Sequence, residues 1–199
     1  MILRYETRRV ATLDLVQMWQ RGHLTPAGDP GAPPWTTRQR VELFDSLERR
    51  WPVGCLVAWN PTGVRWRRWY LLDGHRRMDA LAELVGEHVG LVRDLDSAQP
   101  TYLPTADAVA GGQYLPVNAM LLTTRFLTAS RGLSDDALDV ANWAAGAVVG
   151  TLFEVSTVLG GTPAEVATLC DRLLPGRVQA AALDQIHVGD AAAPDEPPS

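Results

Sequence analysis

The sequence predicts an α+β fold, in which a small mixed sheet with flanking helices is followed by a helical C-terminal part. Two apolar segments, residues 54–59 and 64–72, are joined by the turn sequence Asn-Pro-Thr-Gly, which is the pattern of a β-hairpin. Residues 75–84 then place apolar side chains at helical spacing, and helical patterns dominate from residue 116 onward. Strands followed by runs of helices are typical of the α+β class.

The composition is that of a globular protein, with 46% hydrophobic and 21% charged residues in a chain of 199. We expect residues 1–115 to form the α+β domain and residues 116–188 to form a helical extension packed on it. Residues 189–199 are rich in proline and acidic side chains, so we expect a disordered tail there.

The N-terminal part predicts two helices separated by a loop. Thr12 can cap the first helix, whose apolar periodicity stops at Gly22. Residues 23–34 are rich in glycine and proline and form either a loop that flanks a site or a plain connector. Thr36 or Thr37 begins the second helix.

The hairpin leads into a turn that contains the main candidate functional residues of the chain. The strand ends at Leu72, Asp73 follows it, Gly74 makes the bend, and His75, Arg76 and Arg77 open the next helix. A helix N-terminus presents free backbone N–H groups and partial positive charge, so two guanidinium groups there form a candidate phosphate clamp. Asp73 and His75 are candidates to orient a water molecule or a metal ion.

A structural alternative stays open for the same residues. Asp73 can simply cap the helix, and both arginines can be solvated on its first turn. The sequence alone does not choose between the clamp and the cap.

The second half predicts one more strand, a loop and three helices. We expect a strand at 89–96 and a polar loop at 99–113. The helices are expected at 117–127, 134–159 and 162–173, with Ser134 and Thr162 at the starts of the last two.

The net charge of −5 argues against a protein that binds nucleic acid over its whole surface. A local basic patch at Arg65, Arg67 and Arg68, with Trp66 between them, is a candidate for DNA contacts. The alternative is that Arg65 to Arg68 form the exposed side of a hairpin strand whose tryptophans face the core.

Cys55 and Cys170 lie far apart and lack the spacing of a zinc site, so we expect reduced, buried thiols in a cytoplasmic protein. No segment reaches the roughly 20 apolar residues of a membrane span, and we expect no membrane partner.

The central turn and its surroundings resemble the N-terminal domain of GmrSD-type restriction proteins, a bacterial family with an Asp-Gly-Gln-Gln-Arg motif in the ParB/sulfiredoxin-like superfamily. Asp73, Gly74 and Arg77 match the motif, while His75 and Arg76 replace its two glutamines. The similarity extends to Trp35, the helix at 40–47 and the Pro-Val-Gly entry to the strand at 52–54, and it reaches the helix at 167–173, where Leu-Pro-Gly replaces the usual asparagine and glycine.

The resemblance implies a nucleotide site with Mg²⁺ and a nucleoside triphosphate. It assigns catalytic roles to Asp73 and His75, with Mg²⁺ near Asp73. The phosphate-binding residues would be Gly74, Arg76, Arg77, Arg38 and Ser46.

The leading hypothesis is therefore a nucleotide-binding domain related to proteins of phage defence, with NTP hydrolysis as an open question. One alternative is a non-catalytic module that senses DNA or nucleotide and regulates a separately encoded effector. The other is a small-molecule phosphotransferase.

Overall fold

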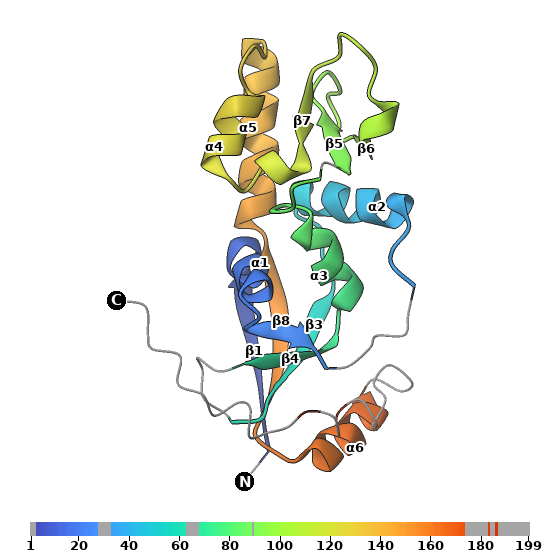
Figure 1. Cartoon of the computed structure of the whole chain (residues 1–199), viewed down its shortest axis with the longest axis vertical. Helices are drawn as coiled ribbons and strands as arrows, with labels where there is room; N and C mark the ends of the chain where they lie inside the picture. The colour runs from blue at the N-terminus through green and yellow to red at the C-terminus, as the bar shows by residue number, and fades with distance from the viewer. Residues whose placement is uncertain are drawn as a thin grey trace, which may run out of the picture.

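The computed structural model describes residues 3–27, 33–62, 68–88, 90–173, 183 and 186. Within these residues it confirms the predicted α+β class, with a five-stranded mixed sheet, a three-stranded sheet and six α-helices (Figure 1). The hairpin-loop residues Arg65, Trp66 and Arg67, residues 28–32 of the predicted loop at 23–34, residues 174–176 and the tail 189–199 lie outside the described part.

The main sheet has the strand order β1-β8-β3-β4-β2. Its strands are β1 (Arg4–Ala11), β2 (Leu24–Pro26), β3 (Cys55–Asn60), β4 (Trp69–Asp73) and β8 (Leu152–Leu159). β3 and β4 pair antiparallel, as the hairpin pattern predicts, whereas β8 runs parallel to β3 and antiparallel to β1. The sheet is therefore mixed, as expected.

Strand β8 corrects the prediction of one helix over 134–159. Helix α5 (Asp135–Gly150) begins as predicted, with the Ser134 hydroxyl accepting from the Ala137 N–H at 3.3 Å, but it ends at Gly150. The next residues form an interior strand with few exposed positions. An interior strand covered on both faces is nearly continuously apolar, so its pattern cannot be told from that of a buried helix.

The other predicted helices are found, with one exception. They are α1 (Thr12–Gln20), α2 (Thr37–Glu48), α3 (His75–Ala82) and α6 (Pro163–Leu173). Thr36 caps α2 in a capping box with Gln39, whereas the N-cap of α1 is Ala11 and the Thr12 hydroxyl donates to the Thr151 carbonyl at 3.1 Å. The helix expected at 117–127 is instead a 3₁₀ turn η2 (Val117–Ala119) followed by α4 (Thr123–Ala129).

The second sheet is antiparallel, with the order β6-β5-β7. The predicted strand at 89–96 is confirmed as β5 (Leu91–Asp94). Its partners β6 (Tyr102–Pro104) and β7 (Tyr114–Pro116), with the 3₁₀ turn η1 (Thr105–Asp107), were not predicted, because strands of three residues leave almost no periodic signal.

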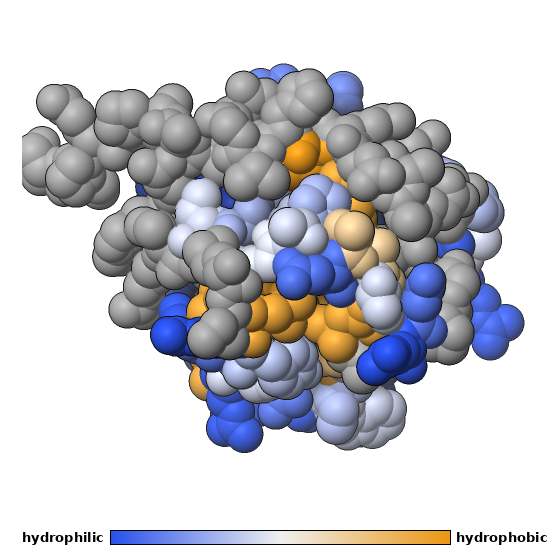
Figure 2. Space-filling model, turned by 90° about the horizontal axis from the view of Figure 1, so that it is seen from below, coloured by the Kyte–Doolittle hydropathy of each residue, from blue (hydrophilic) through white to orange (hydrophobic). Residues whose placement is uncertain are grey.

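The main sheet separates two apolar clusters. Alternate residues of β3 divide between them, with Leu56 and Ala58 in the cluster that contacts α1, α2, α3 and α5, and Val57 and Trp59 in the cluster under α6. On the lower face, where α6 lies, apolar side chains adjoin strongly hydrophilic ones (Figure 2). The side chains of β3 divide between the two clusters because successive side chains of a strand point to opposite faces of the sheet.

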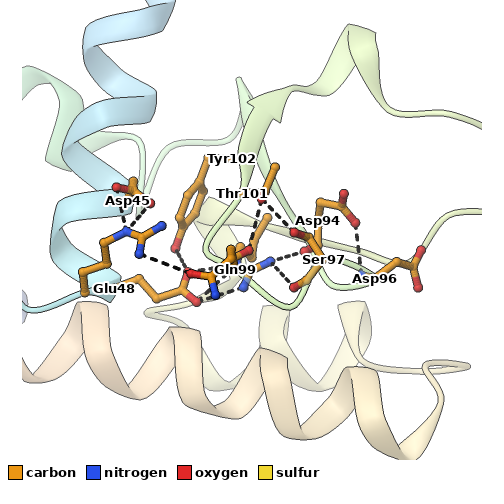
Figure 3. Close-up of polar contacts among 10 residues, drawn as sticks. Asp45, Glu48, Asp94, Asp96, Ser97, Gln99, Thr101 and Tyr102 are labelled. Atoms are coloured by element: carbon orange, nitrogen blue, oxygen red, sulfur yellow. Dashed lines mark hydrogen bonds and ion pairs between the residues drawn. The ribbon is translucent and has the colours of Figure 1, made fainter.

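A buried polar network joins α2 to the second sheet (Figure 3). The Arg93 Nε lies 2.9 Å from Glu48 Oε2, and the Tyr102 hydroxyl donates to the same oxygen at 2.8 Å. Both side chains of the ion pair are 2% exposed. Burial and the neighbouring Glu48 carboxylate raise the pKa of Tyr102 well above its ordinary value.

The two cysteines differ from the expected pair of buried thiols. Both are free, but Cys55 is exposed at the start of β3, and only Cys170 is buried. Burial raises the pKa of Cys170 to about 11. In the described part of the chain, no helix has both the length and the apolar character needed to cross a membrane.

Candidate functional site

The central turn joins β4 to α3 through Gly74. Its φ is +103°, in the left-handed region that disfavours residues with a Cβ atom. A Cβ added there would lie 2.2 Å from Leu56 Cδ2, inside van der Waals contact. Gly74, not Asp73, occupies the N-cap position of α3, and Asp73 is the last residue of β4, opposite Val57.

His75 is the first residue of α3 and is half-buried. Desolvation lowers the pKa of its imidazole, and a backbone hydrogen bond at Leu71 and the charges of Asp79 and Asp73 oppose this shift. Nε2 is buried and makes no hydrogen bond within the described residues. The lowered pKa favours the neutral imidazole at neutral pH, with a nitrogen free to accept a proton.

Arg77 reaches back to the start of β3. Its Nη1 donates to the Cys55 carbonyl, and its Nη2 would lie 3.1 Å from a Cβ added at Gly54. The guanidinium therefore packs on the backbone of Gly54 and Cys55. A side chain at Gly54, the glycine of the Pro-Val-Gly sequence, would crowd this guanidinium, so a glycine suits the position.

Arg76 faces an open pocket of about 340 Å³. Residues 76, 79, 80 and 83 share one face of the α3 segment because they are three or four positions apart. Neighbouring helix positions point in different directions, which separates Arg76 from Arg77. The residues lining the pocket are Pro34, Trp35, Arg40, Arg76, Asp79, Ala80 and Glu83.

One wall of the pocket is an ion pair between α2 and the end of α3. Arg40 Nη1 lies 2.5 Å from Glu83 Oε1, and Arg40 Nη2 donates to the Thr37 hydroxyl at 3.1 Å. Arg40 Nε and Glu83 Oε2 are buried and have no hydrogen-bond partner among the described residues. The ion pair therefore fixes this wall, while two of its buried polar atoms are left unpaired by the described residues.

The remaining pair of charges in the pocket is Arg76 and Asp79. Arg76 makes no ion pair in the part of the chain that the structure describes. Burial raises the pKa of Asp79, and the charge of His75 opposes the shift. The pocket therefore offers the Arg76 guanidinium to an anion and the Trp35 indole to an aromatic ring.

Four of the five predicted phosphate-binding residues, Gly74, Arg77, Arg38 and Ser46, do not line this pocket, and neither do Asp73 and His75. The Arg38 side chain is 88% exposed and pairs with Glu42 at 2.9 Å. The Ser46 hydroxyl donates to the Glu42 carbonyl at 2.7 Å, one turn back along α2. The structure thus brings Arg76 and Trp35 together, whereas Arg38, Ser46 and Arg77 contact other partners.

Sequence reasoning did not assign Trp35, Arg40, Asp79 and Glu83 to the site. For the last two, the helical spacing from Arg76 was an available signal. Trp35 and Arg40 come from a segment far away in sequence, and only tertiary packing brings them to α3.

The described part of the chain contains no further site for the predicted DNA contacts or for a metal ion. Arg68 is exposed just before β4, while Arg65 and Arg67 lie outside the described residues. No group of three or more His, Cys, Asp or Glu side chains gathers there to hold a metal ion.

Neither models of known protein families nor curated proteins give a match to this chain.

Proposed function

We propose that the chain is a nucleotide-binding domain and that the pocket beside α3 holds a nucleoside triphosphate. The observation that carries this proposal is that Arg76 and Trp35 line the same pocket, whose α3 wall runs from Arg76 in the first turn to Glu83 at the end of the helix. The resemblance of the 73–77 turn to the Asp-Gly-Gln-Gln-Arg motif of GmrSD-type proteins supports it.

Each group has a distinct role in the proposed complex. Arg76 forms charge-assisted hydrogen bonds to the phosphates, and the free N–H groups at the start of α3 add to them. Trp35 stacks on the base. A volume of about 340 Å³ lies within the roughly 300–1,000 Å³ of small-molecule pockets. Arg77 donates to the Cys55 carbonyl, so its role in this complex is to position the turn.

Hydrolysis is the second part of the proposal. Mg²⁺ keeps most of its water ligands and binds through one or two carboxylates plus substrate phosphates, so a single carboxylate such as Asp73 fits it without a preformed metal cluster. When bound, Mg²⁺ supplies charge neutralisation at the phosphates. In this part of the proposal His75 is the general base, and the proton of the attacking water would go to Nε2, an atom that is buried and makes no hydrogen bond within the described residues.

The binding test is calorimetric titration of the chain with ATP, GTP, CTP and UTP in the presence of Mg²⁺. We expect binding of at least one nucleotide, and we expect Arg76→Ala to weaken it roughly tenfold or more, because a lost charged hydrogen bond costs about 1.5–3 kcal/mol. Trp35→Ala should also weaken binding. Arg131→Ala, which removes an exposed arginine from the α4–α5 turn, is the matched control.

The alternatives predict other results. No binding of any nucleotide contradicts the proposal. DNA binding that depends on Arg65, Arg67 and Arg68 but not on Arg76 supports a sensing module that regulates a separate effector.

The chemical test follows labelled γ-phosphate. Release of inorganic phosphate that is lost in His75→Gln, with binding retained, supports hydrolysis. Transfer of the label to a small molecule identifies a phosphotransferase, and an unchanged triphosphate restricts the function to binding.

A further inference from the structure

Large apolar side chains are exposed around the C-terminal end of α2. Trp51, Trp143 and Leu152 are 56%, 60% and 54% exposed. Trp51 follows α2, Trp143 lies on α5, and Leu152 begins β8. These elements meet where the Thr151 hydroxyl donates to the Leu47 carbonyl at 3.4 Å. Exposed apolar patches of this kind mark interaction sites.

Each of the two tryptophans carries a guanidinium on its ring. Arg49 Cζ lies 5.1 Å from the ring centroid of Trp51, and Arg50 Cζ lies 5.3 Å from that of Trp143. Both distances are within the range of cation–π contacts. Consecutive arginines thus hold two indoles that belong to different elements.

The backbone at Arg50 has an unusual conformation. Arg50 has a φ of +57°, and among the described residues no other non-glycine residue has a positive φ. Its N–H donates to the Leu47 carbonyl at 3.1 Å, and the Trp51 N–H donates to the Ser46 carbonyl at 2.9 Å. This is a Schellman motif, in which glycine is the usual residue at the position of Arg50. An arginine there directs its guanidinium to Trp143 at the expense of backbone strain.

The residues next to the two tryptophans restrict the backbone at Trp51 and leave space beside Trp143. Pro52 restricts the backbone of Trp51 to extended conformations. Beside Trp143, one turn along α5, a Cβ added at Gly146 would meet no atom within 4 Å. The surface next to the ring is therefore open.

We propose that this tryptophan–arginine surface, formed by Arg49, Arg50, Trp51, Trp143 and Leu152, binds single-stranded nucleic acid. Bases stack on the indole faces that the guanidiniums leave uncovered, and the arginines contact the adjacent phosphates. Duplex is a poor ligand because its base faces are hidden in the stack. A flat ring with a cation beside it occurs twice on this surface, so each pair offers one stacking face and one phosphate contact to a single strand.

The charges predict that stacking dominates this interaction. Arg49 is already paired with Asp45 at 2.8 Å, and the chain as a whole has a net charge of −5. Few phosphates can therefore be neutralised, and the affinity should fall only weakly with added salt.

This surface is separate from the nucleotide pocket. The pocket lies at the N-terminal end of α2, near Trp35, and the tryptophan–arginine surface lies at its C-terminal end. A helix of 12 residues is about 18 Å long. The inference does not depend on the proposed nucleotide site.

The test is fluorescence anisotropy with labelled single-stranded DNA and RNA of about twelve nucleotides and a duplex of equal length, using the full chain. We expect single strands to bind better than the duplex. Trp51→Ala and Trp143→Ala should each weaken binding about tenfold, in line with the loss of one stacked base. Arg50→Lys should also weaken it, because lysine keeps the charge but not the planar stacking group.

Tyr5→Ala is the matched control, since Tyr5 is 56% exposed and pairs with Val158 at the opposite end of β1 from Ala11 and Leu152. Circular dichroism and thermal unfolding establish that each variant is folded. Failure of both oligonucleotides to bind overturns the inference, as does binding that Trp51→Ala and Trp143→Ala leave unchanged. Self-association that is lost in Trp143→Ala, without oligonucleotide binding, assigns the surface to a protein contact instead.

Discussion

At the scale of single residues, Gly74 sets the path of the chain between β4 and α3. A side chain there combines left-handed strain with the 2.2 Å approach to the buried Leu56. Gly22 has a φ of +68°, but a Cβ added to it meets no atom within 4 Å. Gly74 therefore combines a backbone outside the usual αL range with a clash, whereas Gly22 has an αL backbone alone.

We expect Gly22→Ala to lower the free energy of unfolding by about 1–2 kcal/mol through left-handed strain alone. Gly74→Ala should cost about 1–3 kcal/mol more, because Leu56 must move within a packed core. Urea denaturation of both variants measures the difference. Equal losses would show that Leu56 yields freely.

His75 predicts a pH dependence of stability. Its pKa is lowered in the folded state, so the unfolded chain, with a pKa near 6.5, binds the proton first as the pH falls. The contribution of His75 to stability is therefore complete above about pH 7.5 and decreases as the pH drops through about 6.5. Urea midpoints between these values and about pH 5.5 should fall less in His75→Gln than in the parent chain. The same fall in both would assign the pH dependence to other groups.

At the scale of elements, the Glu48–Arg93 pair attaches the second sheet to α2. Glu48→Ala leaves a buried guanidinium without its carboxylate and also removes the acceptor of the Tyr102 hydroxyl. We expect a loss of about 3–5 kcal/mol in the free energy of unfolding. Arg38→Ala, which breaks an exposed pair on the same helix, should cost less than about 1 kcal/mol.

A double variant separates the cost of the uncompensated charge from the cost of lost packing. Replacing both charges, with Glu48→Leu and Arg93→Met, should recover much of the loss, because apolar residues of similar volume often substitute for a buried ion pair. If the double variant were no more stable than Glu48→Ala, packing at the site would outweigh the uncompensated charge.

The helices show which elements a local pattern can identify. α2 and α5 begin at the predicted caps because Thr36 and Ser134 bond to backbone groups three residues ahead. The sequence pattern of residues 152–159 predicts a helix because its apolar residues continue those of α5 with little interruption. Pairing with β1 and β3 decides its conformation, and both partners lie more than 90 residues away in sequence.

At the scale of the whole molecule, β8 links the end of the chain to its beginning. Residues after 116 supply a strand that lies between β1 and β3, and the Trp59 indole donates to the Gly160 carbonyl at 2.8 Å. We expect residues 1–150 expressed alone to lack a cooperative unfolding transition, because β1 and β3 would each lose a paired edge. A sharp thermal transition of this fragment would show that the sheet forms without β8.

The two proposed sites can also be separated at this scale. Nucleotide binding should depend on Arg76 and Trp35, and single-strand binding on Trp51 and Trp143, so variants of one site should leave the other unchanged. Titrating each variant with both ligands checks this. Loss of both activities in one variant would indicate that the sites are coupled.

The sequence by itself determined the α+β class, the hairpin, the capped helices and the strand–turn–helix at residues 73–77. These features depend on local periodicity, glycine and cap chemistry, which act over a few residues. Only the tertiary structure decided that Arg76 faces Trp35 while Arg77 contacts the Cys55 carbonyl, and that residues 152–159 form a strand in the sheet. These outcomes depend on contacts between distant segments, whose packing and pairing energies exceed local propensity.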